Sequence, residues 1–330
     1  MHLSPAAVLI VNCVAVAAWH LPHPALANSP HQISLTLDKS DDDDFDVTSA
    51  DSIAGLRTFA NLPFVDCFSE AATNQKFDIA VFGAPHDTVS HTHPLTPQHR
   101  HCENNIALRL QQTTTGRPGA RFGPPAIRTG SQRKGPGEWS VYTGRNPLQS
   151  WATVVDCGDA SLTWLDNTVS LKRLDKAHKH LILNNSIHAG IRAPLIRRKA
   201  DLRNDVRCGF EIVTARDIDK FGMSGVILRI KDRVRDSKVY ISVDIDVLDP
   251  AYAPATGTAE PGGWSTRELL TILEGLEGLA VVGGDVVEVA PAYDNNGETT
   301  VLAAAEIAYS LIDLMVVTPV RSKADLGDER

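Results

Sequence analysis

The chain has 330 residues, of which 43% are hydrophobic, and its formal net charge is −8. This length and apolar content suffice for one large α/β domain with a buried core. The negative charge is spread along the chain and argues against nucleic-acid binding, which requires clustered basic residues. Neither an internal repeat nor an internal linker divides the sequence, so we expect a single domain over residues 51–330.

The N-terminus is expected to form two segments that precede this domain. Residues 6–19 are an apolar stretch, and the small residues at 25–27 resemble a cleavage site, so residues 1–27 predict a signal peptide and secretion. The stretch is too short for a stable membrane span. Residues 28–50 contain Asp41–Asp44 and are expected to form a solvated, mobile acidic arm.

The cysteines give only a weak disulfide pattern. Removing the signal peptide leaves four cysteines with no C-x-x-C pair. A secreted chain allows one or two bridges, but a buried thiol is the expected state of Cys157 and Cys208, because both adjoin predicted strands.

From residue 77 onward, predicted strands and helices alternate, and this pattern predicts a mostly parallel sheet with helices on both faces. Ligand sites in such sheets lie beyond the carboxyl ends of the strands, where Asp87, Asp159, Asp246 and Glu288 fall. The expected strands are 78–83, 152–156, 185–189, 209–213, 238–246 and 279–288, and the expected helices are 124–132, 168–182, 223–235, 265–276 and 298–315.

The strand at 238–246 carries the most informative pattern. Asp244 and Asp246 have period-two spacing, so both are expected on one side of the strand, which Pro250 ends. Neighbouring carboxylates repel each other unless a cation lies between them, which favours a divalent metal. A half-buried strand with a wet polar face explains a lone D-x-D about equally well.

The residues after this strand favour a binding site over a solvated strand face. Residues 253–263 form a Gly- and Pro-rich loop, and Ser265–Glu268 then has the pattern of a capping box that opens an apolar helix.

Three motifs together resemble the arginase and agmatinase family of ureohydrolases: S-x-D-x-D-x-x-D-P, A-P-A-T-G-T and G-G-W-S-T-R-E. The residues of these motifs are most similar to those of fungal agmatinase-like proteins. The resemblance extends, with interruptions, from Asp51 to Met315. Further blocks that carry it are Phe77–Asp87, Arg117–Pro124, Val155–Asp159, Ile187–Arg192 and Asp285–Pro291.

This resemblance implies an arginase-like three-layer αβα sandwich, commonly assembled into homo-oligomers, with two manganese ions. It implies that a metal-activated hydroxide cleaves a guanidino compound, agmatine, to putrescine and urea. By motif position, Asp244 bridges the two ions and Asp246 holds one of them. Glu288 faces the guanidinium as a catalytic and substrate-binding residue, although a solvated Glu at a strand end explains it about equally well from sequence alone. Thr256 is a substrate-binding position that, like Arg121 and Arg192, also fits a structural role.

The chain departs from the family pattern in its metal ligands. Four of the six expected ligands are absent, because the G-G-D-H and D-A-H-x-D motifs are missing from a shortened interval between Asp159 and His188. We therefore expect a sheet that has lost a central strand and at most weak manganese binding. Two alternatives follow: a catalytically inactive homologue that acts as a binding or assembly partner, and an amidinohydrolase for another guanidino acid.

Two histidine-rich stretches are candidate substitutes for the missing ligands. His178 and His180 are expected on the solvated face of an amphipathic helix. Residues 89–112 are an insertion relative to the family pattern, and their composition favours a disordered loop over a metal site. The insertion and the missing motifs also suggest imperfect splicing or translation of the gene. The insertion contains His91, His93, His99, His101 and Cys102.

Overall fold

The structure is a computed structural model of the whole chain. It describes residues 6–8, 15–18, 57–65, 77–85, 117–135, 137–159, 186–193, 203 and 209–320, and for the first two ranges it describes the backbone alone.

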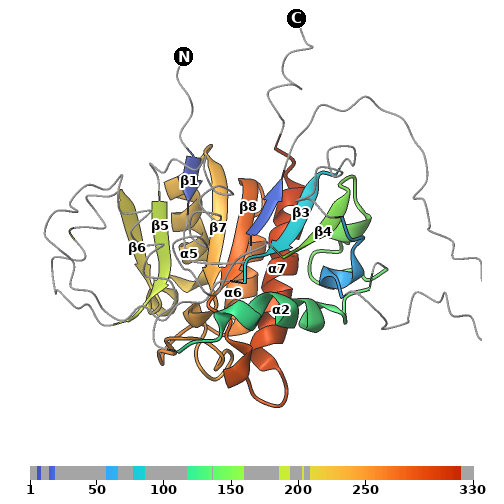
Figure 1. Cartoon of the computed structure of the whole chain (residues 1–330). Helices are drawn as coiled ribbons and strands as arrows, with labels where there is room; N and C mark the ends of the chain where they lie inside the picture. The colour runs from blue at the N-terminus through green and yellow to red at the C-terminus, as the bar shows by residue number, and fades with distance from the viewer. Residues whose placement is uncertain are drawn as a thin grey trace, which may run out of the picture.

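The protein contains two sheets in which most strand pairs are parallel, and the smaller one, β5–β6, lies at one side of the molecule (Figure 1). The first has six strands in the order β1-β7-β8-β2-β3-β4, and the second has the order β5-β6. The ladders β3–β4, β5–β6, β7–β8 and β1–β7 are parallel, whereas β2 runs antiparallel to both of its neighbours. The strands are β1 (Ala6–Val8), β2 (Ala15–Ala18), β3 (Ile79–Gly83), β4 (Val154–Asp159), β5 (Ser186–Ile191), β6 (Phe210–Thr214), β7 (Lys238–Asp244) and β8 (Ala280–Val287).

The centre of the larger sheet contains a strand that the sequence pattern did not predict. β2 lies between β8 and β3, and its Val16 pairs with Gly284 on one side and Val81 on the other. We expected a central strand to be lost, leaving a gap or unpaired ladder groups. The observed strand at this place comes from the N-terminal stretch for which we expected a signal peptide.

The helices are α2 (Gly123–Ser131), α5 (Asp217–Val234), α6 (Thr266–Gly275) and α7 (Thr299–Val317). α6 packs against both α5 and α7, and α7 packs on β8. A Cβ placed on Gly284 of β8 would lie 3.1 Å from a Leu311 methyl group of α7, so the two elements approach closely. The predicted helices at 124–132, 265–276 and 298–315 are confirmed to within two residues at either end. The predicted helix at 223–235 is also confirmed, since the φ of +67° at Gly222 interrupts the longer helix α5 there.

α6 begins with the capping box that its sequence predicts. Ser265 Oγ accepts a hydrogen bond from the backbone N–H of Glu268 at 3.2 Å, and Glu268 Oε2 accepts one from the backbone N–H of Ser265 at 2.7 Å. Two backbone donors of the first turn are therefore satisfied by side chains.

α7 is the central helix of the hydrophobic core. Within its 19 residues, a stretch of 18 has a mean hydropathy of 1.8, and 78% of that stretch is buried inside the protein. By length and composition it passes the test for a membrane-crossing helix, and it is the one helix in the described ranges that does so. Its burial against α2, α6 and β8 is that of a core helix.

A buried ionic network joins α2 to β4. The Arg128 guanidinium donates to both oxygens of Asp156, at 2.8 Å from Nε and 3.0 Å from Nη2, and to the Asp159 carboxylate. Asp156 Oδ2, the oxygen bonded to Nε, also accepts the backbone N–H of Phe59 at 2.6 Å. Asp156 is fully buried, so this pairing compensates the loss of hydration of its charge.

Several expectations lie outside the described residues. These are the acidic arm at 28–50, Asp87, the insertion at 89–112 and the helix at 168–182 with its two histidines. Cys157 lies inside them and corrects our expectation of a free buried thiol, because it is disulfide-bonded, with a partner outside the described ranges. The burial pattern of β4 predicted its low accessibility but carries no information on its partner.

Candidate active site

The strand β7 ends earlier than the sequence pattern predicts. It stops at Asp244, and Ile245–Val247 form one turn of 3-10 helix, η5. The expectation that Asp244 and Asp246 share one face of a continuous strand is therefore wrong. The two carboxyl groups are brought together by the turn, in which Asp244 Oδ1 accepts the backbone N–H of Asp246 at 3.0 Å.

Asp246 is held by a residue that the sequence reasoning did not single out. Thr258 Oγ1 donates to Asp246 Oδ2 at 3.0 Å. Thr258 is the last residue of the A-P-A-T-G-T motif, so the motif itself was the signal that could have found it. Each residue of the Asp pair therefore accepts at least one hydrogen bond within the protein.

The electrostatic environment disfavours negative charge on this pair. Burial raises the pKa of Asp244 well above its usual value, and the charges of Asp246 and Glu288 raise it further. Burial also raises the pKa of Asp246, although the hydrogen bond from Thr258 and the charge of Arg192 oppose the shift. Three carboxyl groups thus interact electrostatically at the carboxyl ends of β7 and β8, where a cation would relieve their repulsion.

Glu288 follows β8 directly and has a strained backbone. Its φ is +59°, in the left-handed region that non-glycine residues rarely adopt, and its side chain is 9% exposed. Burial of an acidic side chain on strained backbone is typical of functional sites. Nothing in the sequence pattern predicts this conformation.

Thr256 lies beside the residue that follows Glu288. It forms an antiparallel bridge with Val289, and the backbone N–H of Ala290 donates to Ala255 O at 2.9 Å. Thr256 is 1% exposed, and its Oγ1 is the one buried side-chain polar atom without a hydrogen-bond partner in the described part of the chain. An unpaired buried hydroxyl costs about 1–3 kcal/mol, so a bound polar group would be favourable here.

Arg192 has the structural role that its motif position implied. It follows β5 and donates to the backbone carbonyls of Leu248 at 3.2 Å and of Glu260 at 2.9 Å and 2.6 Å. It also bonds the Asp246 carbonyl. The guanidinium therefore fixes the turn and the loop that carry Asp246, and it brings a positive charge close to that carboxylate.

The other candidate residues are engaged elsewhere. Asp159 accepts Arg128, so its charge is already paired. His188 of β5 stacks on Phe210 with ring centroids 4.2 Å apart. Arg121 lies over the ring of Phe122.

The described donors do not fit a pair of metal ions. Hard divalent ions require about six oxygen or nitrogen ligands, and no group of three or more His, Cys, Asp or Glu side chains with metal-binding geometry occurs among the described residues. Asp244 and Asp246 supply two carboxyl groups, which also interact with each other. This donor set fits one divalent cation that water would help to ligate.

The comparison with known proteins decides the family. A family model described as the arginase family matches residues 106–187 and 177–313. A Schizosaccharomyces pombe protein named "Putative agmatinase 1" is 36% identical over 83% of this chain and 86% of its own length. The chain belongs to the arginase family.

Other family members align over most of their length. The proclavaminate amidinohydrolase of Streptomyces clavuligerus is 29% identical over 71% of this chain and 88% of its own length. Its solved structure superposes on this arginase-family member with a TM-score of 0.62 and 26% identity, covering 80% of this chain and 98% of the other. The human mitochondrial guanidino acid hydrolase is 30% identical over 65% of this chain and 79% of its own length. The predicted arginase-like α/β fold is therefore confirmed.

Proposed function

We propose that this arginase-family chain is a ureohydrolase that cleaves agmatine, with water, to putrescine and urea. The observation that carries the proposal is the meeting of Asp244, Asp246 and Glu288 at the ends of β7 and β8, where burial and mutual repulsion raise the pKa of Asp244. A site that holds excess negative charge in low-dielectric surroundings favours cationic ligands. Relatives named as agmatinases and as a guanidino acid hydrolase support a guanidinium as that cation.

Glu288 is the residue that we assign to the guanidinium. A planar guanidinium donates paired hydrogen bonds to a carboxylate, and such charge-assisted bonds are about twice as strong as neutral ones. Thr256 Oγ1 lies in the segment bridged to Val289 and is available to accept or donate a further bond to the substrate. Together, these two groups would orient the guanidinium carbon toward the Asp pair.

Asp244 and Asp246 are the residues that would hold manganese. A bound ion there would lower the pKa of a coordinated water and so supply hydroxide near neutral pH. Thr258 and Arg192 act on the protein side, since the first fixes one oxygen of Asp246 and the second fixes the backbone that carries it. A defined carboxylate geometry of this kind is what a metal ligand requires.

A second candidate function is supported by the donor set itself. Two carboxylates are one-third of the six-ligand set that the family resemblance implies, and the described residues supply no third metal donor with suitable geometry. In that case the chain is an inactive homologue that binds guanidino compounds or another protein.

Two measurements on purified full-length chain separate the candidates. The hydrolase is expected to contain manganese and to release urea from agmatine, and both properties should be lost in Asp244→Asn and in Asp246→Asn. The matched control is Asp249→Asn, since Asp249 lies on the same loop but accepts backbone N–H groups of Ala251 and Gly262. Metal-free protein that releases no urea from agmatine or from guanidino acids would establish the inactive homologue.

We also propose that the chain enters the secretory pathway through residues 1–27. The disulfide at Cys157 supports this, because stable disulfides form in oxidising compartments. Microsequencing of the secreted protein is expected to begin at Asn28, and retention of the unprocessed chain in the cytosol would contradict the proposal.

A further inference from the structure

A cavity lies where the two sheets separate. β7 pairs with β8 on one side and, over Lys238–Tyr240 only, with β1 on the other. β5 pairs with β6. The second half of β7 and the facing edge of β5 are therefore not joined by a ladder, and between them, beneath α5 and α6, lies a cavity of about 140 Å³.

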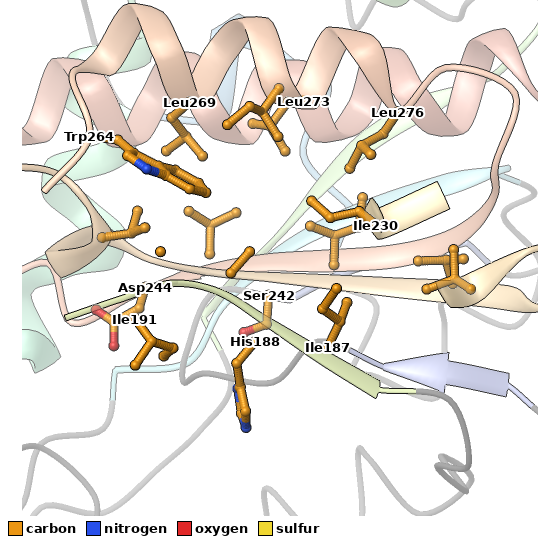
Figure 2. A pocket seen from close by; sticks show the side chains of 18 of the residues that line it. Ile187, His188, Ile191, Ile230, Ser242, Asp244, Trp264, Leu269, Leu273 and Leu276 are labelled. Carbon is orange, nitrogen blue, oxygen red and sulfur yellow. The ribbon is translucent and has the colours of Figure 1, made fainter. Parts of the chain in front are cut away.

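Aliphatic and aromatic side chains form the walls of this cavity. Figure 2 shows Trp264, Leu269 and Leu273 on one side, with Ile230 and Ile187 completing the enclosure. In the same view, the ring of His188 and the carboxylate of Asp244 are turned away from the α6 side chains. The space between the sheet and the helix is consequently lined by hydrocarbon.

The polar groups that border the cavity have partners elsewhere. Trp264 Nε1 donates to Ala215 O at 3.0 Å. Ser242 Oγ donates to Asp285, and Asp246 accepts Thr258. The walls are therefore mainly apolar, with Asp244 and Asp246 among the polar residues that border them, and such surroundings favour an apolar molecule over a polar one.

The end of the cavity nearest the strand termini is closed. Gly190 of β5 has a φ of +85°, and a Cβ at this position would clash with the Val247 side chain of η5. The Arg192 hydrogen bonds to the carbonyls of Leu248 and Glu260 hold the same corner together. The cavity therefore ends at this corner.

We propose that this cavity is a binding site for one compact, uncharged, apolar molecule, such as a single aromatic ring or a short hydrocarbon. Dry apolar cavities of about this volume accommodate benzene, because the ligand regains dispersion contacts that the empty walls lack. The inference does not rest on the proposed ureohydrolase activity, because no step of it involves catalysis or metal.

The test measures binding of fluorobenzene to the full chain by ¹⁹F NMR and thermal unfolding with and without benzene. We expect a Kd at or below about 1 mM. At tenfold excess over the Kd, the unfolding temperature should rise by about 2 °C. Benzylammonium is the charged comparison, and its binding should be at least tenfold weaker.

Two variants occlude the cavity and one controls for them. Ile230→Trp and Leu273→Phe place larger side chains at the wall, and each should abolish fluorobenzene binding. Leu228→Trp adds the same indole on α5, at a side chain that is 60% exposed, and should leave binding unchanged. Two occluding variants are used because one of them can fail to fold.

Absence of fluorobenzene binding would overturn the proposal, as would equal binding by the wild type and a folded occluded variant. Tighter binding of benzylammonium than of benzene would overturn the assignment to uncharged ligands. Urea release from agmatine is measured separately, so failure of the proposed activity leaves this result intact.

Discussion

Glu288 bears two free-energy costs at once, and both suggest a functional role. Its left-handed backbone costs about 1–3 kcal/mol for a non-glycine residue, and its nearly buried carboxylate lies close enough to Asp244 to raise that residue's pKa. A side chain selected for stability alone would avoid both costs. The presence of Glu288 at this position, despite both costs, is explained if its carboxylate contributes to ligand binding.

The first prediction is that Glu288→Gln lowers kcat/KM for agmatine by about 10- to 150-fold. The substitution preserves shape but removes the charge that pairs with the guanidinium, and a charge-assisted bond contributes about 1.5–3 kcal/mol. The measurement is urea release at saturating manganese. Glu298→Gln is the matched control, since Glu298 has a similar φ of +52° at the start of α7 and is exposed. Equal activity in the wild type and Glu288→Gln would remove Glu288 from the site.

The second prediction concerns the buried carboxyl group of Asp285. Burial raises its pKa to about 8, against the hydrogen bonds from Ser242 and Tyr240, which lower it. The pKa of Asp285 is higher in the folded chain than in the unfolded chain, so the protonated carboxyl group favours folding. This contribution to stability is fully present below about pH 4 and is lost as the pH rises toward 8. Between these two pH values, the contribution of Asp285 to the free energy of unfolding falls by up to about 1.4 kcal/mol per pH unit.

Asp285→Asn should remove this contribution to the pH dependence, because an amide does not ionise. The free energy of unfolding of the variant relative to wild type should therefore increase from pH 4 to pH 8. Urea denaturation of both proteins across this range measures it. A difference that stays constant with pH would show that Asp285 titrates normally in the folded protein.

At the residue scale, the sequence predicted which side chains gather at these strand ends but not their geometry, and their roles in a reaction stay predictions. Asp244, Asp246, Glu288 and Thr256 fall together because their motifs follow consecutive strand ends. The hydrogen bond from Thr258 to Asp246 and the left-handed φ at Glu288 were not predictable, since both depend on the path of a loop relative to another strand.

The third prediction belongs to a single element, the helix α6. Ser265→Ala removes the side-chain acceptor for the Glu268 N–H and should lower the free energy of unfolding by about 1 kcal/mol. Thr271→Ala is the control, because Thr271 Oγ1 bonds the Arg267 carbonyl within the same helix and alanine has the higher helix propensity. Chemical denaturation of both variants checks the difference. A Ser265→Ala loss no larger than that of Thr271→Ala would contradict a stabilising cap.

Elements with strong periodicity or clear end signals were predictable. The capping box predicted the start of α6, and the apolar run predicted α7. The end of β7 was misplaced by two residues because alternation of apolar and acidic residues continues through a turn that is no longer extended. The apolar N-terminal stretch was ambiguous, since a signal peptide and a buried strand have the same composition.

At the scale of the whole molecule, the N-terminal stretch has two incompatible roles. As a signal peptide, residues 1–27 would be removed after translocation. In the structure, β1 and β2 come from this stretch, and β2 is paired on both sides in the middle of the six-stranded sheet (Figure 1). Cleavage would expose the ladder edges of β3 and β8, and an unsatisfied buried backbone group costs about 1–3 kcal/mol.

The fourth prediction follows from this conflict. A chain that starts at Asn28 should unfold at a temperature at least about 5 °C below that of the full chain, because the two neighbours of β2 lose their partner. Val16→Pro in the full chain should have the same direction of effect, since proline cannot donate the backbone N–H that a central strand requires. Removal of residues 321–330, which follow α7, is the control and should leave the unfolding temperature within about 1 °C. An unchanged unfolding temperature in both N-terminal variants would show that β3 and β8 need no partner from residues 1–27, and processing of the signal peptide would then be compatible with a stable sheet.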